Sequence, residues 1–312
     1  MDSLTQIALG AAVGVAVMRR RTAVWKAAAW GAVAGTLPDL DVLIDHGDPI
    51  LNMVLHRGET HALFWLTLFS LPFAAAVARL HGEWAQWRRW WLALWLVFIT
   101  HPLLDALTVY GTQLALPFSN HPFGLGSVFI IDPLVTLPWL AGTAWALAAR
   151  GSAAGLRANA VGLALGCAYL AFGVVAQQQV RQQAIASLQA QGVQAERVLV
   201  TPAAFSTLLW RVVAVDADSY REGYRSLLDA PGPMAFDRFE RGAALNAELA
   251  GHDGVQRIRA FSRGFYKLHE ADGLVRISDL RMGAEPHYTF SFAVARRASP
   301  LQPLPVAQSV GR

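Results

Sequence analysis

Cysteine is almost absent from this chain of 312 residues, which contains only Cys167. A single cysteine cannot form an intramolecular disulfide, and it excludes a zinc site built from several thiolates. Charged residues are also scarce, at 15% against 54% hydrophobic residues, and the mean hydropathy is +0.34. This composition excludes an ordinary soluble domain and indicates membrane segments.

The sequence also lacks any dense basic stretch, although its net charge is +4. Scattered arginines argue against nucleic acid as a partner, because phosphate-backbone binding needs a basic patch. Clustered pairs and triplets in short loops, such as Arg88 and Arg89, are better explained by contact with lipid headgroups. We therefore expect membrane lipids, and no nucleic acid, as partners.

The polarity changes sharply along the chain. Residues 1–177 hold 10 of the 26 basic and 9 of the 22 acidic residues, together with most of the long apolar runs. We predict a mainly α membrane bundle over 1–177, a small extracytoplasmic α+β domain over 178–298, and a disordered tail over 299–312. Strand-like runs in the soluble part lie at 197–201, 208–215, 264–268, 274–280 and 288–294, with helical stretches near 237–250 and 253–262.

About six short transmembrane helices account for the apolar runs. They are expected at 4–18, 23–37, 61–79, 90–107, 128–149 and 158–177, the last continuing into a polar helix. Loops on one side of the membrane carry nine Lys and Arg, whereas the opposite segments 38–60 and 108–127 carry only Arg57. The positive-inside rule therefore predicts a multi-pass protein of the bacterial inner membrane with both termini outside. Glycine pairs such as Gly10/Gly14 and Gly31/Gly35 favour close helix packing.

Acids and histidines are scarce on the arginine-rich side and gather on the other. The set is Asp39, Asp41, Asp45, Asp48, His46, His56, Glu59, His61, His101 and Asp105. Acids contribute little to topology, and ionisable groups that are costly near lipid usually mark a functional site. We interpret this cluster as a metal centre at the outer mouth of the bundle.

His101 and Asp105 are four residues apart, so both side chains lie on one helix face. An imidazole and a carboxylate at this spacing can bind one divalent ion, or the carboxylate can orient the histidine. A buried His–Asp hydrogen bond without a metal is an equally common explanation of the motif. Pro102 is tolerable in a membrane helix.

His56 and His61 flank Glu59 in a second motif and are five residues apart, which does not align them on a regular helix. This is not the H-E-x-x-H helix of metalloproteases. Glu59 is a candidate general base, although a role near a positive helix N-terminus explains it equally well. Arg57 is a candidate for binding an anionic substrate, and a salt bridge to Glu59 or Asp48 is the alternative.

Asp39 and Asp41 form a third motif at the outer end of the second predicted helix. Paired carboxylates in a loop suit hard or borderline divalent cations, although a solvated helix end has the same pattern. Together, the six candidate metal ligands are Asp39, Asp41, His56, His61, His101 and Asp105. They suffice for one or two divalent ions, and zinc is our expectation.

Several motifs follow one another in the order of a known family. They are MDSLTQ at 1–6, PDLD at 38–41, HRGETH at 56–61, THPLLD at 100–105, YGTQLALPFS at 110–119 and IDPL at 131–134. With them, residues 1–150 resemble the YdjM-like family of bacterial inner-membrane proteins, which are described as metal-dependent hydrolases. Many members carry histidine where this chain has Gln6, and serine where it has Ala62.

The resemblance implies a membrane-bound metal-dependent hydrolase but fixes no substrate. The HxxxD element is also similar to that of zinc-dependent phospholipases C, which implies a phosphoester or ester of a lipid-like substrate attacked by a metal-bound water. A membrane metal transporter is the alternative, but it would need polar groups continuing to the inner side. A membrane-anchored interaction protein without catalysis is the third hypothesis.

Overall fold

The computed structural model describes residues 1–298 and 300–305, which divide into two compact units. The helical unit comprises Met1–Asp41, Arg57–Val175 and Ala204–Ser206. The sheet unit comprises Val42–His56, Ala176–Ala203 and the described residues from Thr207 onward. Helix α7 (Ala153–Ala190) belongs to both, since the division falls inside it after Val175. The unbroken α7 confirms the prediction that the last apolar helix runs on into a polar one.

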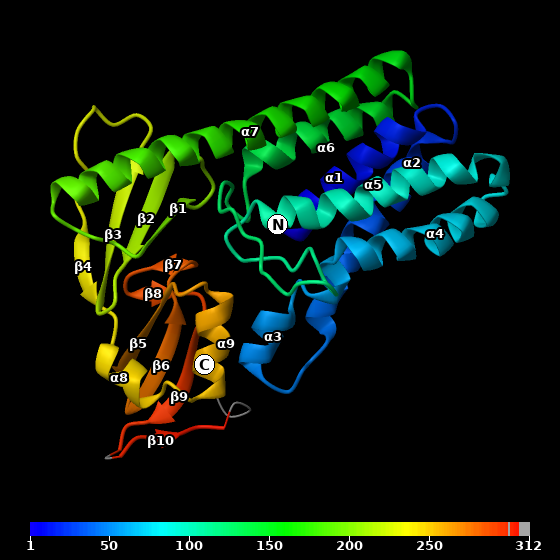
Figure 1. The fold of residues 1–312 in the computed structure, drawn as a ribbon. Helices are drawn as coiled ribbons and strands as arrows, with labels where there is room; N and C mark the ends of the chain where they lie inside the picture. Colours follow the sequence, from blue (N-terminus) through cyan, green and yellow to red (C-terminus); the bar gives the residue numbers. More distant parts are fainter. Residues whose placement is uncertain (299, 306–312) are drawn as a thin grey trace. The chain divides into compact units, whose positions relative to one another are not determined.

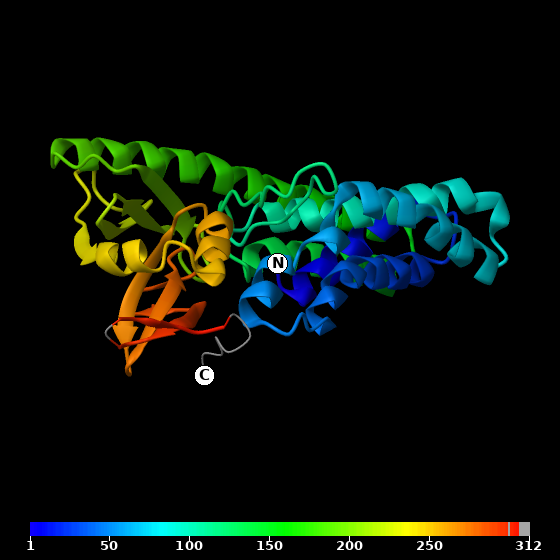
Figure 2. The same ribbon diagram turned by 60° about the horizontal axis from the view of Figure 1, so that its bottom comes forward.

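The helical unit is a bundle of long helices packed side by side (Figure 1 and Figure 2). These helices are α1 (Ser3–Met18), α2 (Val24–Thr36), α4 (Leu63–Leu80), α5 (Trp87–Ala106), α6 (Pro133–Ala148) and the first part of α7, with the turns η1 (Leu37–Leu43), η2 (Glu59–His61) and η3 (Trp84–Gln86). The predicted fifth helix starts late, at Pro133. The reason is that the Asp132 carboxylate caps α6, accepting from the Leu134 N–H at 3.0 Å, and proline is favoured at the first helical position.

Fewer helices than predicted are clearly long and apolar enough to span a membrane. Among the described residues, only α4 and α7 are long and apolar enough, by length and composition, to cross a membrane. Helices α1 and α6 are apolar but have 16 residues each, fewer than the roughly 20 that span a bilayer. The structure therefore supports a helical unit in which two helices, rather than the predicted six or so, are clearly membrane-capable.

Glycines bring α1 and α2 into backbone contact. A Cβ atom added at Gly10 would lie 2.2 Å from the carbonyl oxygen of Gly31, and one at Gly35 would lie 2.6 Å from that of Gln6. No larger residue fits at such distances, so these positions require glycine. The close approach agrees with the prediction from the glycine pairs. It also fixes the position of the Gly35 carbonyl group, which reappears in the candidate site.

The sheet unit contains two four-stranded antiparallel sheets. The first has the order β1–β2–β3–β4, formed by Arg197–Pro202, Leu209–Val215, Ser219–Ser226 and Asp237–Glu240. The second half of α7 covers it: Ala176, Val180 and Ala184 form one apolar core with Trp210 and Val212 (Figure 1). Buried small residues on one helix face therefore explain why the polar half of α7 remains a helix.

The second sheet has the order β10–β9–β6–β5, and a short hairpin, β7–β8, accompanies it. Its strands are β5 (Tyr266–Ala271), β6 (Leu274–Asp279), β9 (Ser291–Arg296) and β10 (Gln302–Pro303), the hairpin is Gly283–Ala284 with His287–Tyr288, and the helices of this unit are α3 (Pro49–Leu55), α8 (Ala243–Glu248) and α9 (Asp253–Phe261). Helix α3 packs against α9. An α+β sheet domain is thus present.

Three local predictions in this unit need correction. Strand β3 was not expected, because its sequence SYREGYRS is polar and contains Gly223, yet it pairs with β2 and β4 on its two sides. The helix predicted near 237–250 is short, because 237–240 extend the first sheet as β4. In the predicted disordered tail, Gln302 and Pro303 pair with β9, while residues 299 and 306–312 lie outside the described residues.

Candidate metal centre

Four predicted ligands converge in the helical unit: Asp39, His61, His101 and Asp105. Three separate segments supply them. Asp39 lies in η1, His61 is the last residue of η2, and His101 and Asp105 lie one turn apart on α5. His61, His101 and Asp105 are at most 1% exposed. The site is therefore built inside the bundle, and the i,i+4 spacing on α5 works as predicted.

One atom from each residue points to a common centre. The Nε2 atoms of His61 and His101 are 3.2 Å apart. Asp39 Oδ1 lies 3.3 Å from the first and 3.4 Å from the second, and Asp105 Oδ2 lies 3.4 Å and 3.3 Å from them. All four atoms lie within 4.8 Å of one another. Five of the six separations are thus nearly equal, and the sixth, between Asp39 and Asp105, is at most 4.8 Å.

The orientation of His101 is set by the helix contact between α1 and α2. Its Nδ1 lies 2.8 Å from the Gly35 carbonyl oxygen, which is only an acceptor. The hydrogen bond therefore assigns the ring proton to Nδ1, which leaves the Nε2 lone pair facing the centre. Metal-binding histidines commonly donate their second ring N–H to a backbone carbonyl in this way.

A different partner orients His61. The Thr60 hydroxyl donates to Asp41 Oδ2 at 2.8 Å, and so presents a lone pair to His61 Nδ1 at 2.9 Å. Asp41 Oδ2 is itself 3.7 Å from Nδ1. His61 Nδ1 then donates, and its Nε2 lone pair also faces the centre. Asp41, predicted as a ligand, instead holds the segment around His61, because it also accepts the Arg57 N–H at 2.9 Å.

The centre therefore gathers acceptors rather than matched donors and acceptors. Two imidazole lone pairs and two carboxylate oxygens face one another, and the buried Asp105 Oδ2 makes no hydrogen bond. Such a set repels itself unless cations lie between its members. Two neutral nitrogens and two anionic oxygens fit a divalent cation.

The second oxygen of Asp105 faces cationic groups. Its Oδ1 lies 3.3 Å from the Arg57 Nη2 and also contacts the amino group of Met1. Arg57 is 3% exposed, bonds the Thr108 hydroxyl through Nη1 at 3.2 Å, and lies over the Tyr110 ring. Its salt-bridge partner is thus Asp105 rather than the predicted Glu59 or Asp48. The buried Arg57 Nε has no hydrogen-bond partner.

The remaining predicted site residues lie elsewhere. His56 follows α3 and belongs to the sheet unit, so the structure does not place it among the four converging residues. Glu59 begins η2 with an exposed side chain. Sequence reasoning missed the roles of Thr60, Thr108 and the Gly35 carbonyl. The hydroxyl before His61 was visible in the motif, but a backbone carbonyl leaves no sequence signal.

The fold and the site together define a helical membrane-protein unit with a candidate metal centre of two histidines and two aspartates. A family model described as "YdjM inner membrane protein" matches residues 1–180. The match covers more than half of the chain, so the chain belongs to this family, and it includes all four converging residues.

A curated relative extends the similarity beyond the helical unit. "Uncharacterized protein YfhP" of Bacillus subtilis (strain 168) is 24% identical over 303 residues, covering 93% of this chain and 89% of the relative. The similarity to this relative therefore extends into the sheet unit. No solved structure matches the chain.

Proposed function

We propose that this protein is a membrane-bound, metal-dependent hydrolase whose centre is formed by Asp39, His61, His101 and Asp105. The observation that carries the proposal is the convergence of two imidazole nitrogens and two carboxylate oxygens at separations of 3.2–3.4 Å. Perturbed and buried ionisable groups of this kind cluster at functional sites. Membership in an inner-membrane family supports a membrane location.

Zinc is the ion that the ligand types favour, because two imidazole nitrogens and two carboxylate oxygens are a common donor set for tetrahedral zinc. Octahedral Mg²⁺ prefers oxygen ligands and usually keeps several waters, and Ca²⁺ takes more numerous oxygen ligands at longer distances. When bound, zinc would supply Lewis acidity, polarising a carbonyl or phosphoryl oxygen.

Arg57 supports an anionic, ester-like or phosphoester substrate. Its guanidinium group lies beside Asp105, and the N–H group of its buried Nε has no acceptor. Guanidinium matches phosphate and carboxylate oxygens, so Arg57 would hold the anionic part of a substrate next to the centre. Glu59, an exposed carboxylate on the same turn as His61, is the proposed general base for the attacking water. A lipid-like substrate suits a membrane-embedded unit.

The orientation in the membrane is part of the proposal. Nine Lys and Arg residues in loops 18–26, 79–89 and 150–157, against Arg57 in the opposite segments, favour a multi-pass arrangement with those loops in the cytoplasm. The Asp/His centre and the sheet unit would then face away from the cytoplasm.

A closed, structural metal site is the second candidate, and one observation favours it. Four protein ligands fill a tetrahedron, whereas catalytic zinc usually keeps one position for water or substrate. Asp39 would decide between the two, because its side chain is 18% exposed while those of the other three are at most 1% exposed. In the hydrolase, Asp39 is the ligand that would shift to admit substrate.

The experiment uses the full-length protein purified in detergent without chelators. Bound metal is measured by mass spectrometry, and hydrolysis is measured against a panel of phosphoester and carboxylic-ester lipids. His101→Ala should lose metal and activity together, whereas His121→Ala, an exposed histidine of the same unit, should keep both. Glu59→Gln should keep the metal and lose most turnover. Metal bound without hydrolysis of any lipid would favour the structural site, and no bound metal would refute both candidates.

A further inference from the structure

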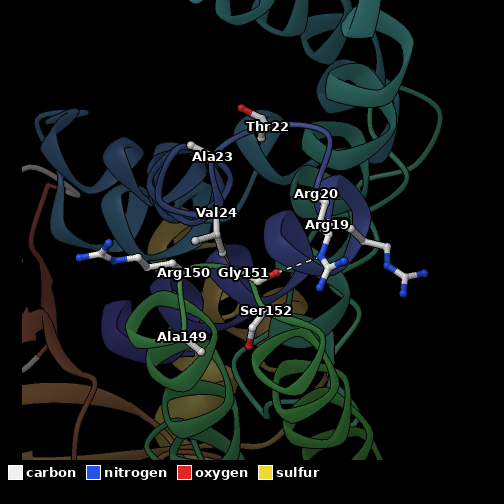
Figure 3. A pocket seen from close by; sticks show the side chains of 9 residues that line it. All are labelled: Arg19, Arg20, Thr22, Ala23, Val24, Ala149, Arg150, Gly151 and Ser152. Carbon is white, nitrogen blue, oxygen red and sulfur yellow. Dashed lines mark hydrogen bonds between the residues drawn. The ribbon is translucent and has the colours of Figure 1, made fainter.

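A second candidate site lies at the other end of the helical unit. Two loops, one between α1 and α2 and one between α6 and α7, line an open pocket of about 380 Å³ (Figure 3). Helix α1 connects the two sites: Met1 contacts Asp105 before its first turn, and the helix ends at Met18, next to the pocket residue Arg19. Its 16 residues separate them by about 24 Å at 1.5 Å per residue. The pocket is thus independent of the Asp/His centre.

The pocket is strongly basic. Arg19, Arg20 and Arg150 line it, and no acidic residue does. Within the described part of the chain, none of these three arginines forms an ion pair with a carboxylate. Glu83 accepts a hydrogen bond from the pocket residue Thr22 at 2.8 Å. The charge of Glu83 is already offset by Lys26, which lies 2.9 Å from it. Three arginines therefore line the pocket without a counter-charge from the protein, and Figure 3 shows the Arg19 and Arg150 side chains directed away from each other.

Local structure holds the two loops together. Arg20 Nε donates to the Gly151 carbonyl oxygen at 3.2 Å, and Figure 3 shows this bond joining the loops, with the side chains of Arg19 and Arg150 extending on either side. Arg19 and Arg150 have positive φ angles of 51° and 47°, which are uncommon for residues other than glycine. Since Nε makes the link, the terminal nitrogens of Arg20 remain available to a ligand.

The start of α2 adds a weaker attraction for anions. Its N-cap is Ala23, a pocket residue with no side-chain acceptor, so no side chain caps the first N–H groups of the helix. A helix N-terminus favours negative charge. Because the C-terminal ends of α1 and α6 lie in the same loops and oppose this effect, the guanidinium groups remain the dominant attraction.

We propose that this pocket binds a phosphate group, carried by an anionic membrane lipid or by a soluble phosphate. Guanidinium groups match phosphate oxygens with paired hydrogen bonds. Trp25, which follows the pocket residue Val24, is 59% exposed, and Trp84 is 46% exposed with Arg79 over its ring. Exposed tryptophans beside arginines are typical of the level of lipid headgroups. The pocket would therefore anchor the inner end of the bundle to a phosphate.

The first test maps arginine protection in the unmodified protein. The full chain is placed in nanodiscs of phosphatidylcholine or of phosphatidylglycerol, or kept in detergent with inorganic phosphate, then treated with phenylglyoxal and analysed by mass spectrometry. Anionic lipid should protect Arg19, Arg20 and Arg150 in preference to Arg21, an exposed arginine of the same loop that does not line the pocket. Protection by inorganic phosphate as well would identify a soluble phosphate as a sufficient ligand.

The second test compares two triple variants with the same change in charge. Arg19→Gln/Arg20→Gln/Arg150→Gln removes the pocket arginines, and Arg21→Gln/Arg88→Gln/Arg157→Gln removes three exposed arginines that do not line it. General surface attraction, about 1 kcal/mol per arginine, should fall equally in both variants, and the loss of the paired hydrogen bonds of the pocket should weaken phosphatidylglycerol binding by about a further tenfold in the first variant alone. Equal weakening in both variants, or equal protection of Arg21 in the labelling test, would mean only general surface charge and would overturn the proposal.

Discussion

The two units each bury a cluster of ionisable side chains, and the clusters are built differently. In the sheet unit, Glu222 lies 2.7 Å from Arg211, 2.8 Å from the Tyr224 hydroxyl and 3.3 Å from that of Tyr288. Nearby, the Glu285 carboxylate contacts both Lys267 and Tyr220. Each carboxylate there meets a cation and a hydroxyl donor. In the Asp/His centre, by contrast, acceptors face acceptors.

This difference separates a polar core from a binding site. A buried charge is stable when partners within the protein neutralise it and satisfy its hydrogen bonds, as for Glu222. In the Asp/His centre, Arg57 and the Met1 amino group offset the charge of Asp105 from one side, but four lone pairs are still directed at one point, which is unfavourable unless a cation lies there. The Asp/His centre therefore requires something that the folded chain does not supply, and the sheet-unit cluster does not.

The largest loss of stability is expected from a substitution in the cluster of the sheet unit. Glu222→Gln leaves the Arg211 charge buried and uncompensated, which typically costs about 3–5 kcal/mol. Hydrogen exchange of peptides from β2 and β3 in the full-length protein should report this loss. The control Glu270→Gln removes an ion pair with Arg297 whose side chains are about half exposed, and such pairs contribute at most about 1 kcal/mol.

Glu222→Gln should also leave the metal content unchanged. The two clusters lie in different units, and no residue of the sheet-unit cluster is among the four converging residues. A variant that lost metal while Glu270→Gln kept it would contradict the separation of the two clusters.

Removal of the metal should have the next largest effect, and in the other unit. Chelation withdraws the charge that offsets the Asp/His centre, and a ligand at a hundred times its Kd stabilises a fold by about 2.7 kcal/mol. Hydrogen exchange around α5 and η2 should therefore increase after chelation and return to its earlier level when zinc is added. Exchange in β2 and β3 should not change. An unchanged α5 would show that the centre is stable without a cation.

A smaller effect is expected from the residue that orients His61. Thr60→Val removes the hydroxyl between Asp41 and His61 Nδ1, and loss of such an outer partner lowers metal affinity about 10- to 100-fold. Thr100→Val is the matched control, because Thr100 also precedes a converging histidine but bonds only backbone carbonyls of its own helix. Competition with a chromophoric chelator measures both affinities. Equal affinities would remove the orienting role of Thr60.

Spacing along a regular helix was a sound guide to the site, whereas spacing in irregular segments was not. His101 and Asp105 lie as expected because α5 is continuous through Pro102. Asp39 and Asp41 could not be distinguished in advance. In the 3-10 helix η1, with three residues per turn, positions two apart face different directions, so one carboxylate enters the centre and the other binds the loop.

The remaining errors come from contacts that the sequence does not display. His56 was grouped with His61 because they share a motif, but the short helix α3 before it belongs to the sheet unit. Strand β3 depends on pairing with β2 and β4 rather than on its own apolar residues. The motifs contain the four residues that converge, and the tertiary structure determines which side chains of each motif do so.

The smallest expected effect is a pH dependence of the sheet unit. Burial, and then the charge of Lys267, lower the pKa of His269 below its ordinary value of 6.5, and its buried Nδ1 has no hydrogen-bond partner. Below pH 6.5 the unfolded chain therefore binds a proton more readily than the folded one, so stability falls as the pH falls, by at most about 1.4 kcal/mol per pH unit. His269→Gln should abolish this slope in hydrogen exchange of β5 between pH 6.5 and 5. Glu222 does not interfere, because its pKa lies below 4.5 and its contribution is lost only at lower pH. A slope that persists in His269→Gln would assign the titration to another group.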